Sequence, residues 1–156
     1  MRTKARHVVY FYKAFTRNST LTDKAIGLFT GGRYSHVEIT MSNEDKVLRI
    51  SDRVDVKLVS CPIYNDDNWD KIIIYADKSF DEDIVRLYTE CIGKKYDLFG
   101  ALFSAFGSIK WFCNNDREFC SEAVHNILYG EDGCNYSPNR LFNKLIKEKS
   151  YTAPCE

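Results

Sequence analysis

A cysteine at the head of a predicted helix and a histidine on a predicted strand could do chemistry together. Cys120 precedes a segment with helical spacing of its apolar residues, "SEAVHNILYG", and His36 lies in "YSHVEI", whose alternation is typical of a strand. A thiol attacks a carbonyl carbon only as the thiolate, which a helix N-terminus or a neighbouring imidazole favours. If the fold brings this strand against this helix, we expect a nucleophile and its base.

Plainer interpretations of the histidines and cysteines stay open. A free cysteine is often a small core residue, and a lone histidine on a strand is more often structural than functional. His7 stands beside Arg6 at a strand entrance, so we expect it at the surface. His125 follows Cys120 by five residues, and on a helix the two side chains point about 140° apart, so they cannot serve each other.

Length and charge narrow the protein class. The chain has 156 residues, enough for one core, so we expect a single domain over 1–156. Lys plus Arg and Asp plus Glu number 22 each, which gives no net field that would attract nucleic acid. The basic start is followed by an apolar stretch too short for a signal peptide or a membrane span. We therefore expect a cytoplasmic protein, in the host cytoplasm if a phage encodes it.

Six cysteines are present, at loose spacing, and without an export signal reduced thiols are the better interpretation. The separation of Cys113 and Cys120 fits neither a CxxC knuckle nor a zinc ribbon. We expect no metal and no cofactor.

The hydrophobic pattern changes its period along the chain. The first half predicts strands at 7–14 and 71–76, a short helix at 19–32 and a hairpin over 34–60. The second half predicts helices at 79–93, 119–129 and 137–149, and at 96–112 a mostly buried helix or a helical turn followed by a loop. In the hairpin, strict alternation groups Tyr34, His36, Glu38 and Thr40 on one face, opposite Val37, Ile39 and Met41. Strands followed by helices favour an α+β fold, an antiparallel sheet packed by helices.

Four short motifs in this order resemble the circularly permuted branch of the NlpC-type papain-like superfamily, which includes YiiX/YaeF-like, poxvirus and phage proteins. They are "YSHVEI", "GKKYDLFGAL", "FCSEAV" and "YSPNRL", and they span roughly residues 8 to 145. In that branch the histidine strand precedes the cysteine helix, as His36 precedes Cys120 by 84 positions (120 − 36) here. The resemblance implies a permuted papain-like arrangement.

Carried over by position, the resemblance makes Cys120 the nucleophile and His36 the general base and later acid. The backbone N–H groups of Cys120 and Ser121 could hold an oxyanion. Relatives often carry His or Glu on the next strand to orient the imidazole, but "LRISDRVD" offers neither. Ser51 is the preferred orienter, and Glu38, on the same strand face as His36, is its rival.

The reaction implied is acyl transfer through a thioester on an amide, peptide or ester bond. The substrate would be a peptide, a cell-wall peptide or a lipid-like acyl compound. Tyr34, Tyr96 and Phe119 are candidates for a substrate pocket, or else core residues. Two alternatives are an inactive binding module of the same fold and a phage protein that inhibits or modifies a host target.

Overall fold

The computed structural model describes most of the chain, and the longest segment outside the described residues is 97–116. The described residues are 4–50, 56–60, 64, 67–77, 79–92, 95–96, 117–118, 120–130 and 136–152. The predicted helix at 96–112 lies outside them except for Tyr96, which the structure places in a short strand.

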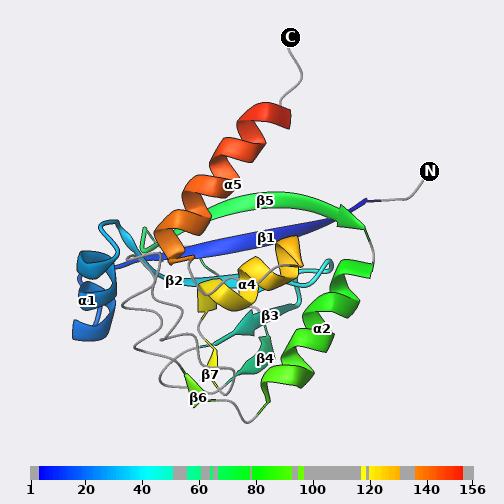
Figure 1. Cartoon of the computed structure of the whole chain (residues 1–156), viewed down its shortest axis with the longest axis horizontal. Helices are drawn as coiled ribbons and strands as arrows, with labels where there is room; N and C mark the ends of the chain where they lie inside the picture. Colours follow the sequence, from blue (N-terminus) through cyan, green and yellow to red (C-terminus); the bar gives the residue numbers. More distant parts are fainter. Residues whose placement is uncertain are drawn as a thin grey trace.

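Five strands form one antiparallel sheet in the order β4-β3-β2-β1-β5 (Figure 1). The strands are β1 (Lys4–Lys13), β2 (Tyr34–Thr40), β3 (Lys46–Arg49), β4 (Lys57–Ser60) and β5 (Trp69–Asp77). The predicted hairpin is therefore the first part of a three-strand meander. Because β2 has neighbours on both sides, the strand that carries His36 is held in the middle of the sheet.

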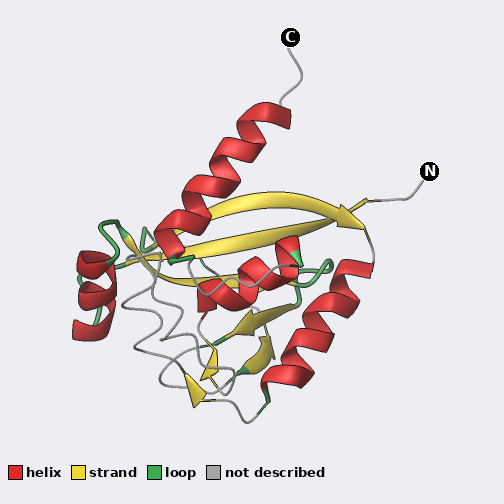
Figure 2. Cartoon of the chain, in the orientation of Figure 1, coloured by secondary structure: helices red, strands yellow, loops and turns green. Residues whose placement is uncertain are grey.

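Four helices lie in the described part of the chain: α1 (Leu21–Phe29), α2 (Ser79–Cys91), α4 (Cys120–Tyr129) and α5 (Pro138–Thr152). In Figure 2, α4 and α5 are drawn in front of the sheet, and both pack against β2. Two-residue strands β6 (Lys95–Tyr96) and β7 (Arg117–Glu118) pair in parallel just before α4. The predicted α+β class, with an antiparallel sheet and helices, is confirmed.

The core lies between the helices and one face of the sheet. Ladder partners such as Val9 and Ile39 alternate along their strands with residues of the other face, which places them together on the core side. Their burial supplies the main driving force for packing the helices on the sheet. The buried cluster includes Val9, Phe11, Val37, Ile39, Leu48, Ile72, Ile84, Cys120, Val124 and Leu141.

A register shift interrupts β2 just before His36. His36 pairs with Tyr12, but Tyr34 pairs with Lys13, so β2 has one extra residue, Ser35, at this point. Such a β-bulge changes the face to which the following side chains point. The strict alternation predicted for β2 is therefore wrong at Tyr34.

Two further predictions, on the position of His7 and on membrane spans, can be compared with the structure. His7 is fully buried rather than at the surface, and its Nδ1 lies 3.1 Å from the carbonyl oxygen of Thr40. Among the helices that the structure describes, none has the length and apolar character needed to span a membrane.

Candidate functional site

Cys120 is the first residue of α4 and carries a free thiol. The helix packs against β2, with α2 and α5 as its other neighbours (Figure 1). Because α4 begins at this residue, the N–H groups of its first turn, including those of Cys120 and Ser121, have no carbonyl partner within the helix. The positive end of the helix dipole thus lies at the sulfur.

The fold brings Cys120 and His36 together. The Cys120 sulfur lies close enough to the His36 imidazole to act on its ionisation, although 84 positions (120 − 36) separate the two residues in the chain. Burial alone would lower the pKa of His36, but the Cys120 sulfur, together with Glu38, raises it from 6.5 to about 10. These interactions favour the protonated form of His36, the imidazolium.

Glu38 binds one nitrogen of the imidazole. Its Oε1 lies 3.0 Å from Nε2 of His36. Because Glu38 is only 1% exposed, this carboxylate orients the ring in a setting with little solvent screening. The structure thus places Glu38, the rival candidate, in the position of the orienter. Ser51, the preferred candidate, lies outside the described residues.

Two further side chains hold the Glu38 carboxylate. Arg49, on β3, donates from Nε to Oε1 at 2.5 Å and from Nη2 to Oε2 at 3.2 Å. The Tyr64 hydroxyl donates to Oε2. Both oxygens of this buried carboxylate are therefore occupied, as a buried charge requires.

These partners set the ionisation of Glu38. Burial would raise the pKa of its carboxyl, yet the hydrogen bond and charge of His36 lower it from 4.5 to about 2, with further contributions from Arg49 and Tyr64. Burial and the charge of Glu38 in turn raise the pKa of Tyr64, so its hydroxyl stays protonated and continues to donate. Glu38 is therefore an anion over the whole physiological pH range.

The residues predicted for a substrate pocket are not gathered around this pair. Tyr34 is 1% exposed, its ring packs on Phe11 and Phe142, and its hydroxyl donates to Asp70 at 2.5 Å. It is a core residue, because the bulge turns it to the face opposite His36. The side chain of Tyr96 and all of Phe119 lie outside the described parts.

Aromatic residues that the sequence did not single out lie beside His36 instead. The ring of Trp69 is edge-on to the imidazole at 6.2 Å between centroids and contacts the rings of Tyr10, Tyr12 and Tyr64. These four side chains are partly exposed. Strand pairing brings these residues together, since Trp69 pairs with Tyr12 and Tyr12 pairs with His36. Such pairing cannot be read from a single sequence.

No metal site accompanies the pair within the described ranges, where no group of three or more ligand-type residues could hold an ion. His125 lies elsewhere: its ring stacks on Tyr136 at 4.0 Å and its Nε2 lies 3.3 Å from Nζ of Lys144. This separation from Cys120 is what helical geometry predicts.

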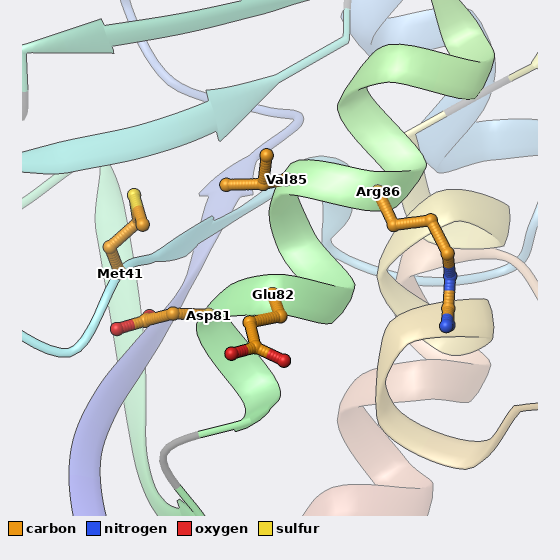
Figure 3. Close-up of a pocket in the computed structure, with 5 residues that line it drawn as sticks. All are labelled: Met41, Asp81, Glu82, Val85 and Arg86. Carbon is orange, nitrogen blue, oxygen red and sulfur yellow. The ribbon is translucent and has the colours of Figure 1, made fainter.

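A pocket at the start of α2 is lined by neither Cys120 nor His36. Its lining consists of Met41, Asp81, Glu82, Val85 and Arg86, and Figure 3 shows the Arg86 side chain extending away from Met41. None of the candidate catalytic residues lines it, so it contributes nothing to the chemistry of that pair.

Comparison of the chain with protein-family models, with curated proteins and with solved structures found no match.

Proposed function

We propose that this protein is a cysteine-dependent hydrolase or acyltransferase that acts on an amide, peptide or ester bond through a thioester. The observation that carries the proposal is the proximity of Cys120, at the head of α4, to the imidazole of His36. A nucleophile beside a base, with the base oriented by a third group, is the arrangement that covalent catalysis requires. Here Glu38 is the third group. The permuted papain-like arrangement and the kinship with NlpC-type enzymes belong to the same proposal.

The steps follow from the charges at the site. The Cys120 thiolate attacks the carbonyl carbon and forms a C–S bond, while the carbonyl oxygen becomes an oxyanion held by the N–H groups of Cys120 and Ser121. The C–N or C–O bond then breaks, and the leaving amine or alcohol takes the proton of the His36 imidazolium. The product of this half-reaction is an acyl-thioester on Cys120.

The second half-reaction regenerates the site. Neutral His36 accepts a proton from water, or from another acceptor nucleophile, as this attacks the thioester carbon. The C–S bond breaks, the acid or acyl product leaves, and the thiolate and imidazolium are restored. Glu38 remains ionised throughout and stabilises the imidazolium each time it forms.

Selective alkylation of Cys120 tests the proposal. We expect a brief reaction with iodoacetamide at pH 6 to label Cys120 faster than the other five cysteines of the chain, because the imidazolium favours its thiolate. Peptide mapping by mass spectrometry identifies the labelled residue. A rate at Cys120 no greater than that at Cys155 would contradict the proposal.

One observation favours an inactive binding module on the same fold. Cys120 is 2% exposed, so in this structure the thiol is not open to a substrate carbonyl. A binding module predicts slow alkylation of Cys120 and no acyl transfer to it from activated peptide or lipid esters. Acyl probes of both kinds, read by intact mass, separate the two functions and indicate the substrate class.

A further inference from the structure

The backbone of Tyr34 is bound by a side chain from the last helix. Its N–H donates to Oδ1 of Asn139 at 2.9 Å, and its carbonyl oxygen accepts from Nδ2 of the same residue at 2.9 Å. Asn139 lies 105 positions away, in the first turn of α5. One amide thus supplies both an acceptor and a donor to a strand residue, as a neighbouring strand would do.

These bonds occur where β2 needs them. The register shift at Ser35 lies between Tyr34 and His36, and a bulge disrupts the regular ladder at this point. Buried backbone groups without partners are costly, so the bulge is stable only with partners for both groups of Tyr34. Asn139, itself 8% exposed, provides them.

The surroundings of Asn139 are adapted to this contact. Its second amide hydrogen goes to Oγ1 of Thr30 at 2.7 Å, so the oxygen and both N–H groups of the amide are in use. A Cβ on Gly32 would lie 2.2 Å from Cγ of Asn139, closer than atoms can approach. Only glycine at position 32 leaves room for the amide.

The bulge decides where the imidazole points. Regular alternation would place Tyr34 and His36 on the same face, whereas the structure places Tyr34 in the core and His36 beside Cys120 and Glu38. Loss of the bulge would turn one of the two side chains to the wrong face.

We propose that Asn139 is a positioning residue for His36: by holding both backbone groups of Tyr34, it maintains the bulge that directs the imidazole to Cys120. This inference rests on the proposed function, since it assigns a role within the same Cys–His pair. It would make α5 a support of the site through Asn139, which itself takes no part in the chemistry.

Two variants remove the contact in different ways. Asn139→Ala deletes the amide, and Gly32→Ala displaces it with a single methyl group. In both, we expect the alkylation rate of Cys120 at pH 6 to fall about tenfold or more, because small displacements of reacting groups are costly. The pH midpoint of alkylation should rise, and the NMR titration of His36 should move towards that of an exposed histidine.

Two controls distinguish positioning from general destabilisation. Thr30→Val removes the third hydrogen bond of Asn139, together with the bond from the Thr30 hydroxyl to the carbonyl oxygen of Ile26, but keeps both bonds to Tyr34, so it should leave the pH profile close to that of the wild type. Leu145→Ala creates a cavity on the same helix and lowers stability, but it should not move the pH midpoint. Circular dichroism checks folding, and if Asn139→Ala does not fold, Asn139→Asp, which keeps only the acceptor, must show the same change.

The outcomes separate this inference from the proposed function. Wild-type pH profiles in the folded Asn139 variant and in Gly32→Ala, with a changed profile in His36→Ala, would overturn the positioning role alone. An unchanged profile in His36→Ala would overturn both. Changed profiles in His36→Ala, in the Asn139 variant and in Gly32→Ala, with neither control affected, would support the role of Asn139.

Discussion

Replacing Glu38 by glutamine removes one negative charge from the centre of the site with little change of shape. The substituted side chain keeps one oxygen, but it faces Arg49 and the His36 imidazolium with an NH₂ group and no charge. Two cationic groups then lose their counter-ion in a buried position, which is a strongly destabilising change.

The size of the effect follows from the ionisation of Glu38. Although burial opposes it, the partners of Glu38 lower its pKa from 4.5 to about 2. The stabilisation is therefore complete above pH 4.5 and is lost as the pH falls through about 2. A shift of this size corresponds to about 3 kcal/mol of unfolding free energy at neutral pH. We expect Glu38→Gln to be less stable by this amount at pH 7, and the difference to vanish near pH 2.

Urea unfolding followed by circular dichroism, repeated between pH 7 and pH 2, measures this difference. The same variant should also alkylate Cys120 more slowly at pH 6, by about tenfold, since loss of a group that orients a functional side chain commonly costs 10- to 100-fold. Stability and reactivity thus report on the same carboxylate independently.

Asp81→Asn is the matched control. Asp81 belongs to α2 and accepts hydrogen bonds from the backbone and the hydroxyl of Ser42 at 2.9 and 2.5 Å, and its nearest histidine is His7 rather than His36. This variant should lose stability without slowing alkylation. A Glu38→Gln protein with the wild-type alkylation profile, or a stability difference that persists at pH 2, would refute our account of the site.

Two further variants test the remaining members of the site. His36→Ala should leave the protein folded, because the residue is not fully buried, and should move the pH midpoint of alkylation towards ~8.5, the value of a free thiol; an unmoved midpoint would mean that the pair does not form. Tyr64→Phe removes one of the donors to Glu38 and should cost about 1 kcal/mol in urea unfolding, with a smaller slowing of alkylation than in Glu38→Gln. A Tyr64→Phe effect as large as that of Glu38→Gln would contradict our expectation that the Tyr64 hydroxyl contributes less to the site than the Glu38 charge.

The local elements of the fold could be predicted from the sequence because their signals are short-range. Apolar periods of two and of 3.6 residues located the strands and the helices, and Thr20, a residue type that favours helix caps, forms a capping box with Asp23. The candidate pair could be named for the same reason, since a thiol at a helix head and a histidine within a strand are each visible locally. The sequence also contained Glu38, two residues from His36, as one of two possible orienters.

Tertiary structure decided which of these possibilities combine. Glu38 binds the imidazole because Arg49, from the neighbouring strand, and Tyr64 stabilise its buried charge, and pairing between strands is not readable from one sequence. Tyr34 was predicted to line a substrate pocket but lies in the core, because a bulge interrupts the alternation of side chains along β2. The backbone at that bulge is bound by an amide 105 positions away, and no local pattern could show such a contact. Side-chain types and spacing are local properties, whereas the partners that satisfy a buried charge or a broken ladder are supplied by the folded chain.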